Sequence, residues 1–480
     1  MKLKDLLQGV EVLCATADME AQIQGVAYDS RKVTPGSLFV AISGFASDGN
    51  RFIPMAMEKG AAAVVTAKKP DMDVPYVLVS SDRLALALIA TIYYGHPARR
   101  MTMIGITGTN GKTSATLLLK HVLETVKGAK VGLIGTMENR IGDLVIPTER
   151  TTPESFELQS LFAQMAEAGC TYTVMEVSSH AIALDRVGGI HYDVGAFTNL
   201  TEDHLDFHKT MEHYCDTKAQ LLRRCRKGVV NRDDPYFARI TAGATCELLT
   251  VSEHESDGLY AEDITLLSDG VSFTAVLGDQ KVKVSLPIPG RFTVYNALTV
   301  LGIACSLDIT LPDAAAALAT AKGVKGRVEV VPTPGKDYTV LIDYAHTPDG
   351  LENVLASVKD FCRGRVICVF GCGGDRDPIK RPIMGEIGVR LADIAVITSD
   401  NPRSEEPMAI IRDIVKGIPE GYNNYEVVEN RVQAIHCAMD IAEKSDIIVL
   451  VGKGHETYQE ICGVKNHLDE REVVADYLRK

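Results

Sequence analysis

A glycine-rich segment between residues 107 and 113 combines the residue types that hold phosphate. It reads Thr-Gly-Thr-Asn-Gly-Lys-Thr and lies between an apolar stretch, 101–107, and a stretch of helical composition, 113–126. Backbone N–H groups of such a loop can surround phosphate oxygens, Lys112 can neutralise β- and γ-phosphate charge, and the Thr113 hydroxyl can ligate Mg²⁺. A strand before the loop and a helix after it favour a nucleotide site over a chance lysine in a connection. The predicted ATP loop comprises Gly108, Thr109, Asn110, Gly111, Lys112 and Thr113.

Residue types suited to divalent metals follow this loop. Glu176 lies at the end of the apolar stretch 172–177, and a carboxylate at a strand end beside a phosphate loop is the usual second anchor for Mg²⁺. His204 lies within 199–208, a segment dense in metal-capable side chains. By residue chemistry alone, Glu176 could instead be a solvated carboxylate and the segment around His204 a capped helix start. Lys218, on a predicted helix over 211–222, is by the same reasoning a surface lysine.

Four apolar strands predicted in the last third of the chain are each followed by a polar, glycine-rich segment. The strands are 338–342, 365–370, 393–398 and 446–451. Ligands bind outside the carboxyl ends of strands in open parallel sheets, so the four segments predict one site. Arg376 and Arg403 could each hold a carboxylate through two parallel hydrogen bonds, and Glu456 could hold an ammonium group. For any one of these residues a salt bridge at the rim is the alternative.

The order of these elements predicts an α/β protein of three domains. A chain of 480 residues is too long for one compact core. Short strands and helices broken by turns come first, and repeated strand–helix alternation then predicts a parallel sheet with helices on both faces. The alternation starts afresh in the last third. We expect domains at 1–97, 98–327 and 328–480.

Composition and charge exclude several classes of protein. The formal net charge of −13 argues against a nucleic-acid surface. Apolar runs such as 447–451 are far shorter than a membrane span, and the first five residues, Met-Lys-Leu-Lys-Asp, do not begin a secretory signal. Eleven cysteines without paired spacing are typical of reduced, mostly buried thiols. We expect a cytoplasmic protein with no membrane insertion and no nucleic-acid partner.

Taken together, the motifs resemble the Mur ligase family, which shares its ATP loop with folylpolyglutamate synthetases. The resemblance covers essentially the whole chain and implies a central P-loop-type parallel-sheet ATPase domain. It also implies an amino-terminal domain that binds a nucleotide sugar and a carboxyl-terminal Rossmann-like domain that binds an amino acid. The matching motifs stand in family order at 107–113, 176–180, 198–206, 290–296, 326–329 and 343–346.

The resemblance assigns roles to individual positions. It adds Asn296, Arg327 and Asp343 to the ATP site. Its metal ligands match Thr113, Glu176, His204 and Lys218, with Lys218 carbamylated, which replaces the surface interpretation of that lysine. Positions that hold the nucleotide sugar match Ser30, Thr151, Thr152, Ser178 and Arg186. The amino-acid site matches Arg376, Asp400, Asn401, Pro402, Arg403, Gly452 and Glu456.

The resemblance also implies a reaction. Asp-Asn-Pro-Arg, at 400–403, is the form seen in members that add diaminopimelate, and lysine-adding members lack that arginine. We expect ATP- and Mg²⁺-dependent joining of meso-diaminopimelate to the D-Glu γ-carboxylate of UDP-MurNAc-L-Ala-D-Glu, through an acyl phosphate, in peptidoglycan precursor synthesis. Lys112 and Lys218 are the expected catalytic lysines, and His346 is a candidate base for the attacking amine. A monomer is expected.

Ile106 stands where a strict Walker A loop has its first glycine. Three positions depart from the family pattern, and none of them removes a phosphate or metal residue. Glu202 and Thr293 replace a common arginine and asparagine. Leu184 replaces a glutamine that touches the nucleotide sugar in relatives. Two other interpretations stay open: a lysine-adding ligase of the same family, and a P-loop ATPase that switches a binding surface.

Overall fold

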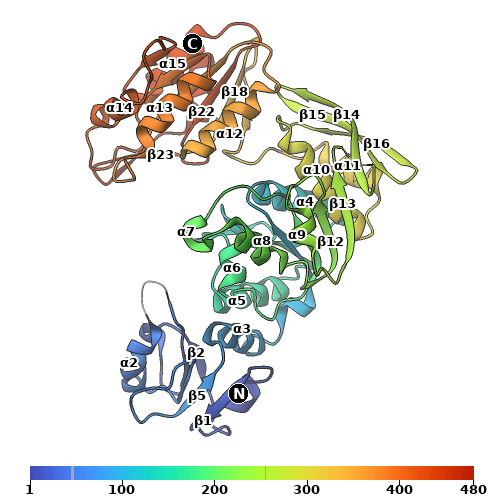
Figure 1. Ribbon diagram of the computed structural model, residues 1–480, viewed down its shortest axis with the longest axis vertical. Coiled ribbons are helices and arrows are strands. Elements are labelled where there is room, and N and C mark those ends of the chain that lie inside the picture. The colour runs from blue at the N-terminus through green and yellow to red at the C-terminus, as the bar shows by residue number, and fades with distance from the viewer. Residues whose placement is uncertain (45–47, 149, 255, 480) are drawn as a thin grey trace. The chain divides into compact units, whose positions relative to one another are not determined.

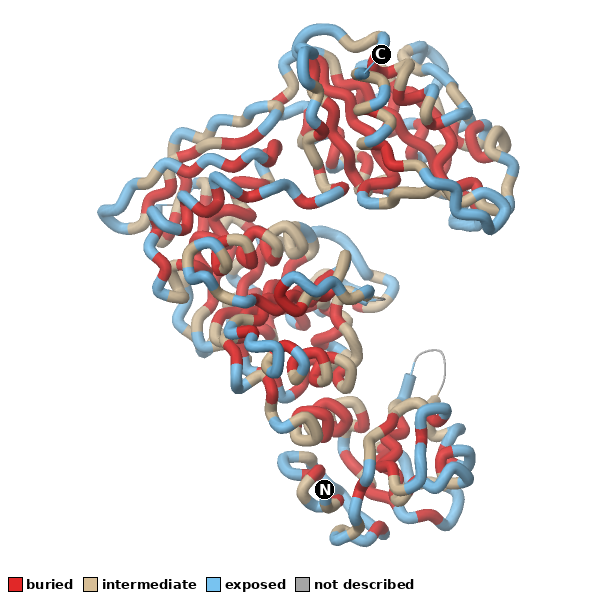
Figure 2. Tube along the Cα trace, turned by 180° about the vertical axis from the view of Figure 1, so that it is seen from behind, coloured by how far each residue is buried: buried red, intermediate tan, exposed pale blue. Residues whose placement is uncertain are grey.

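The computed structural model describes residues 1–44, 48–148, 150–254 and 256–479 of the chain. By their internal contacts these residues form two compact units. The first comprises Met1–Leu259 with Thr299–Ala314, and the second Tyr260–Leu298 with Ala315–Lys480. In each unit, buried strands form the centre and exposed residues lie mainly on loops and outer helix faces, as Figure 2 shows.

A five-stranded sheet opens the first unit. Its elements are α1 Leu3–Leu6, β1 Val12–Ala15, β2 Gly25–Ala27, β3 Ser37–Ala41, α2 Ile53–Glu58, β4 Ala63–Thr66, β5 Tyr76–Val79 and α3 Asp82–Tyr93. The strand order is β1-β5-β4-β3-β2, parallel except for β1. Neighbouring strand residues alternate between faces: Leu38 packs with Leu86 of α3, and Phe39 packs with Ile53 of α2. The sheet is therefore covered by helices on both sides.

The second sheet of this unit carries the predicted ATP loop. Its strands are β6 Thr102–Thr107, β7 Val131–Ile134, β8 Asn139–Ile141, β9 Leu144–Ile146, β10 Tyr172–Glu176, β11 Tyr192–Phe197, β12 Cys225–Asn231 and β13 Glu247–Ser252. They lie in the order β13-β12-β11-β6-β10-β7-β8-β9, and all neighbouring pairs are parallel except β7–β8 and β8–β9. Strand β6 therefore has a parallel neighbour on each side, and its carboxyl end lies beside those of β10 and β11.

Helices pack against this sheet. They are α4 Lys112–Lys127, α5 Ser155–Glu167, α6 Ser179–Ala183, α7 Leu205–His208, α8 Met211–Ala219 and α9 Phe237–Thr241. Phe162 of α5 packs with Met103 of β6, and Tyr214 of α8 packs with Phe197 of β11. These contacts hold the strand ends in a fixed register with the helix starts that follow them.

The second unit ends in a six-stranded sheet between two layers of helices. Its order is β17-β18-β22-β19-β20-β21, parallel except for β17. Helices α12, α13 and α14 pack on one face and α15 and α16 on the other (Figure 1). The elements are β17 Glu329–Val331, β18 Thr339–Asp343, α12 Pro348–Lys359, β19 Val366–Phe370, α13 Lys380–Leu391, β20 Ile394–Ile397, α14 Pro407–Val415, β21 Tyr425–Val427, α15 Arg431–Ile441, β22 Ile447–Val451 and α16 Glu470–Leu478.

The remaining elements follow β13 and β22 along the chain. Strands β23 and β24 form a two-stranded hairpin after β22, and β15 and β16 form a longer antiparallel pair. Their bounds are β14 Leu259–Leu267, β15 Gly270–Leu277, β16 Gln280–Leu286, α10 Phe292–Ser306, α11 Leu311–Leu318, β23 Tyr458–Ile461 and β24 Val464–His467.

The predicted α/β class with three sheet-rich domains is confirmed, and most predicted elements shift by one or two residues. Strand β11 ends at Phe197, where Thr198 and Asn199 turn to bond the phosphate loop. The predicted helix 211–222 ends early, at Ala219. The domain boundaries after residues 97 and 327 remain a prediction, because the two units divide the chain elsewhere.

Two expectations from composition can be set beside the structure. All eleven cysteines are free, but four are buried, five partly buried and two exposed, so the expectation of mostly buried thiols was too strong. Within the described ranges, no helix is both long enough and apolar enough to span a bilayer.

Candidate active site

The phosphate loop lies at the carboxyl end of β6 and runs directly into α4. Gly108 has φ +146° and Gly111 has φ +84°, conformations that favour glycine. A Cβ on Gly108 would lie 1.9 Å from the Thr198 Oγ1, so no larger residue fits. The Lys112 ammonium donates to the carbonyl oxygens of Gly108 at 2.9 Å and Thr109 at 2.7 Å. The Lys112 ammonium is thus held by carbonyl oxygens of its own loop.

The Glu176 carboxylate joins three strand ends beside this loop. Its Oε1 accepts the Thr113 hydroxyl at 2.9 Å and the Thr136 N–H at 2.8 Å, and its Oε2 accepts the Thr136 hydroxyl at 3.0 Å. Glu176 is only 1% exposed, which excludes a solvated strand-end carboxylate. A buried carboxylate held by hydroxyl and amide donors next to a phosphate loop suits a divalent cation. Thr113 and Glu176, two of the predicted metal ligands, therefore lie together.

Lys218 reaches the same loop from α8. Its ammonium is 1% exposed, donates to the Gly108 carbonyl at 2.8 Å and lies 4.5 Å from the centre of the Tyr214 ring. Burial, and then the positive charge of Lys112, hold the pKa of Lys218 well below its ordinary value. The interpretation of Lys218 as a surface lysine is wrong.

His204 lies on the loop before α7, with φ +54° and a half-exposed side chain. Its ring stacks edge-on against His180, with centroids 4.8 Å apart, and lies 6.3 Å from the Tyr214 ring. Tyr214 is also the residue under the Lys218 ammonium, so His204 faces the side of the loop on which Lys218 lies. Among the residues that the structure describes, no group of three or more His, Cys, Asp and Glu could hold a metal ion.

The predicted nucleotide-sugar residues surround the same edge of the sheet. Thr152, 1% exposed, donates its hydroxyl to the Glu176 carbonyl at 2.8 Å and lies 3.3 Å from the Ser178 Oγ. Arg186 donates to the Thr152 carbonyl at 3.3 Å and lies 2.8 Å from a Glu154 oxygen. Thr151 lies 3.0 Å from the Thr136 hydroxyl. Ser30 is separate: it is buried at the start of a short 3₁₀ helix, Ser30–Lys32, and its hydroxyl lies 3.4 Å from the Met55 sulfur.

Three predicted ATP residues belong to the second unit. Asn296, on α10, is buried. Asp343 ends β18, where its carboxylate accepts the N–H groups of Val328 and Ala345, both at 2.8 Å. Burial raises the pKa of Asp343, although the positive charge of Arg327 acts in the opposite direction. The Arg327 guanidinium lies 5.5 Å from the centre of the Tyr344 ring.

The ends of four parallel strands in the second unit line one cavity of about 550 Å³. Asn401 and Glu456, which follow two different strands, are hydrogen bonded to each other at 2.8 Å, and the Arg403 guanidinium donates to the Gly374 carbonyl at 2.7 Å. Arg376 is exposed at the rim. The lining includes His346 after β18, Gly373 and Arg376 after β19, Asp400, Asn401 and Arg403 after β20, and Gly452 and Glu456 after β22. Pro402, buried between Asn401 and Arg403, is not among the lining residues.

Gly452 is required by this cavity. Its φ is +117°, and a Cβ at this position would lie 2.8 Å from an Asp400 carboxylate oxygen. His346, the candidate base, is exposed, and its ring Nδ1 lies 3.0 Å from the Tyr344 carbonyl. Arginines, carboxylates and an amide around one cavity can bind a zwitterion with an additional carboxylate.

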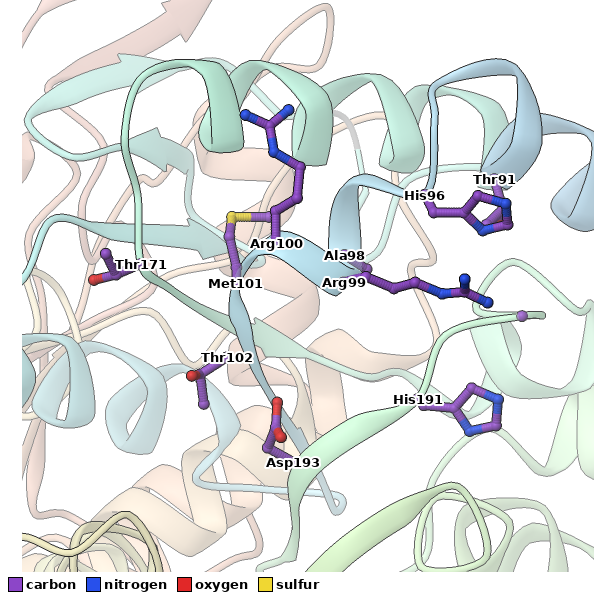
Figure 3. Close-up of a pocket in the computed structure, with 11 residues that line it drawn as sticks. Thr91, His96, Ala98, Arg99, Arg100, Met101, Thr102, Thr171, His191 and Asp193 are labelled. Carbon is purple, nitrogen blue, oxygen red and sulfur yellow. The ribbon is translucent and has the colours of Figure 1, made fainter.

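Figure 3 shows another cavity, of about 480 Å³, that contains none of the predicted site residues. Thr102, Thr171 and Asp193 place it at the amino ends of β6, β10 and β11, whereas the phosphate loop follows their carboxyl ends. His96, Arg99 and His191 point to the same side of the pocket, and Arg100 turns away from them (Figure 3). The cavity therefore lies at the opposite edge of the sheet from the phosphate loop.

Sequence reasoning missed several residues that complete these sites. Thr136 binds Glu176, Tyr214 contacts both Thr109 and Lys218, and Lys380 donates to the His346 carbonyl at 2.7 Å. Thr136 had a usable signal, because Gly-Thr follows the apolar strand β7 in the same way that polar residues follow β6 and β10. Tyr214 and Lys380 lie on helices and carried no such signal.

A phosphate loop on one parallel sheet and an amino-acid-sized polar cavity at the strand ends of another are the parts of an ATP-dependent ligase. Comparison with protein-family models gives three matches in succession: the Mur ligase family catalytic domain over 22–106, the Mur ligase middle domain over 106–304, and the Mur ligase glutamate ligase domain over 326–454. Together they match most of the chain.

Individual relatives agree over the full length. The chain is 46% identical to the UDP-N-acetylmuramoyl-L-alanyl-D-glutamate–2,6-diaminopimelate ligase of Clostridium tetani over 100% of both chains. It is 47% identical to the ligase of the same name from Caldanaerobacter subterraneus subsp. tengcongensis, over 100% of this chain and 99% of that one. A solved structure of a ligase with this name superposes with a TM-score of 0.77 at 28% identity, covering 100% and 99% of the two chains. The chain belongs to the Mur ligase family and is an ATP-dependent ligase.

Proposed function

We propose that this ligase joins meso-diaminopimelate to the D-Glu γ-carboxylate of UDP-MurNAc-L-Ala-D-Glu, with ATP converted to ADP and phosphate, in peptidoglycan precursor synthesis. The observation that carries the proposal is the acceptor cavity. It retains Asp400, Asn401 and Arg403 after one strand and Glu456 after another, in a chain 46% identical to a diaminopimelate ligase. Arg403 also argues against an acceptor such as lysine, which has no second carboxylate for it to bind.

The first step brings two anions together, the γ-carboxylate and the ATP γ-phosphate, and electrostatics dominate it. The loop N–H groups and the Lys112 ammonium would hold the phosphates and stabilise charge that develops during transfer. Lys112 would leave the carbonyls of Gly108 and Thr109 to do so, which makes these two contacts a resting position. The product of this step is an acyl phosphate.

Mg²⁺, when bound, offsets the phosphate charge. Thr113, Glu176, His204 and Lys218 fit as its ligands, and the fit rests on the buried Glu176 carboxylate and on the state of Lys218. Only a neutral amine reacts with CO₂, and the lowered pKa of Lys218 favours the neutral form. A carbamate would also turn the repulsion between Lys218 and Lys112 into attraction. We therefore propose that Lys218 is carbamylated.

In the second step the amine of diaminopimelate attacks the acyl carbonyl and phosphate leaves. Arg376 and Arg403 would hold carboxylates of the amino acid, while Asp400, Asn401 and Glu456 would hold its other ammonium group. His346 lines the cavity and is a candidate for accepting a proton from the attacking amine. Thr151, Thr152, Ser178 and Arg186 would hold the dipeptide near the phosphate loop, and Ser30 the uridine nucleotide. Asn296, Arg327 and Asp343 would contact the ATP nucleoside.

We further propose that the enzyme is cytoplasmic and monomeric. ATP is an intracellular substrate, and eleven free thiols are typical of a reducing compartment.

The test is phosphate release with ATP, Mg²⁺ and UDP-MurNAc-L-Ala-D-Glu, with meso-diaminopimelate or L-lysine offered in parallel. Release with diaminopimelate and a product heavier by one residue is expected. Preference for lysine would keep the ligase and refute the acceptor assignment, and release without any amino acid would support a switch ATPase.

A further inference from the structure

Lys453 lies behind the acceptor cavity and is fully buried, with 0% of its side chain exposed. It follows β22 and stands between two glycines of positive φ, Gly452 at +117° and Gly454 at +54°. These turns carry the chain away from the sheet and direct the lysine inward, although it is not itself one of the lining residues. An ammonium group without solvent must be held by partners inside the protein.

The partners of Lys453 are the polar side chains that line the cavity. Its Nζ lies 3.4 Å from an Asp400 oxygen, 3.1 Å from the Asn401 Oδ1 and 3.3 Å from a Glu456 oxygen. These three residues follow two different strands, β20 and β22, so the lysine joins the two strand ends. Its alkyl chain ends beside Tyr458, whose ring centre is 5.8 Å from the Nζ.

The charges show what this arrangement does for a ligand. Asp400 and Glu456 are two carboxylates at one wall of the cavity, and Lys453 supplies one positive charge behind them. Within this cluster of two carboxylates and one lysine, one negative charge is in excess, and it can pair with one ammonium group. The bond from the Asn401 Nδ2 to Glu456 at 2.8 Å orients that amide so that its oxygen faces Lys453. Without the lysine, the two carboxylates would repel each other. The Asn401 Oδ1 would also lose one of its donors and keep the Glu460 N–H, at 2.9 Å.

We propose that Lys453 is a positioning residue for the acceptor: it fixes Asp400, Asn401 and Glu456 in the geometry that binds the ammonium group of the incoming amino acid. The inference rests on the proposed function, because it takes the cavity to be the amino-acid site. It goes beyond that function because it makes Lys453, which does not touch the substrate, responsible for how this wall of the cavity recognises the amino acid.

Lys453→Met tests the proposal because it keeps the alkyl chain and removes the ammonium. We expect the KM for diaminopimelate to rise about 10- to 100-fold, as for the loss of hydrogen bonds to charged groups, with the KM for ATP and for the dipeptide substrate within about twofold of wild type. Lys453→Gln should recover part of the loss, since its amide can donate to the same oxygens without the charge.

Lys120→Met is the matched control. Lys120 is also buried, 6% exposed, and pairs with Glu124 at 2.5 Å on α4, in the other unit. Lys120→Met should leave all three KM values unchanged, although it also removes the ammonium group of a buried lysine with a carboxylate partner.

Two outcomes would overturn the inference. Equal changes in the KM for all substrates would make Lys453 a general structural residue. Failure of both Lys453 variants to fold, when Lys120→Met folds, would lead to the same conclusion. The proposed function fails separately, through a wild-type enzyme that does not respond to diaminopimelate at all.

Discussion

The phosphate loop and the acceptor cavity both lie at the carboxyl ends of parallel strands, but they are built from different groups. At the phosphate loop, the backbone makes the site: glycines at 108 and 111 free the N–H groups, and the lysines donate to backbone carbonyls. At the acceptor cavity, charged and amide side chains from four strand ends face an open space of about 550 Å³. Phosphate has the same shape in every nucleotide, so backbone suffices, whereas an amino acid must be distinguished by its side chain.

The largest expected effect is on turnover and comes from a change in the phosphate loop that should leave binding of the acceptor amino acid intact. Lys112→Ala should lower kcat by on the order of 10³-fold, because it removes the cation nearest the transferring phosphate. Acceptor binding, measured by calorimetry, should be unchanged, since the cavity is formed wholly by the second unit. Lys127→Ala, at the other end of α4, is the control and should keep wild-type kcat. A Lys112→Ala enzyme with wild-type turnover would refute the phosphate-loop assignment.

Lys218→Ala should lower kcat by about 100-fold or more, above the range for residues that only orient a metal ligand. Added bicarbonate should raise wild-type activity in CO₂-depleted buffer, and mass spectrometry of the intact protein or ¹³C NMR should detect the carbamate. Activity should fall as pH is lowered, because protonation of the amine prevents carbamate formation. The exposed Lys209→Ala is the control. Unchanged activity after thorough CO₂ removal, with no carbamate signal, would rule out the modification.

The third prediction concerns the acceptor cavity alone. Arg403→Ala should raise the KM for diaminopimelate by about 10- to 100-fold, the range expected for a lost hydrogen bond to a charged group. The KM for ATP should stay within about twofold of wild type. Arg390→Ala, which removes an exposed guanidinium paired with Glu352 on the same unit, should change neither value. Equal effects of Arg403→Ala on both substrates would contradict a carboxylate clamp.

The smallest effect concerns stability. Burial, with the neighbouring His180 charge next, lowers the pKa of His208 to about 4, and its Nε2 lies 2.9 Å from the Ser179 hydroxyl. The unfolded chain takes up the proton near pH 6.5, so the folded protein loses stability as pH falls from about 6.5 towards 4. Chemical unfolding at several pH values should show a shallower pH dependence in His208→Gln than in wild type. Equal slopes would show that His208 is not the group responsible.

The two regions also differ in how far the sequence predicts them. The phosphate loop and the four strand ends could be found from local pattern, because short apolar strands and the polar residues after them are adjacent in sequence. The order of strands in each sheet then places Glu176 beside Thr113 and Asn401 beside Glu456. Family resemblance was needed for Lys218, because nothing in its own helix marks it as buried.

Local sequence patterns do not predict which polar residues are buried, nor which contacts come from residues on helices. In the sequence, Lys453 is an ordinary lysine between two glycines. It is buried only because the sheet order brings the residues after β20 close to those after β22. Tyr214 contacts Thr109 from 105 residues away, and such a contact depends on how α8 packs. Such contacts follow from tertiary packing and leave no periodic trace in the sequence.

The glycines of these sites also bear on how inhibitors could be resisted. A side chain at 108 or 452 would collide with Thr198 or Asp400 and would have to adopt a backbone conformation rare for any residue but glycine. A compound whose binding depends on the backbone at these two positions would meet few escape mutations, since the change that dislodges it also damages the site. Compounds that rely on the exposed Arg376 or His346 would leave more routes to resistance open.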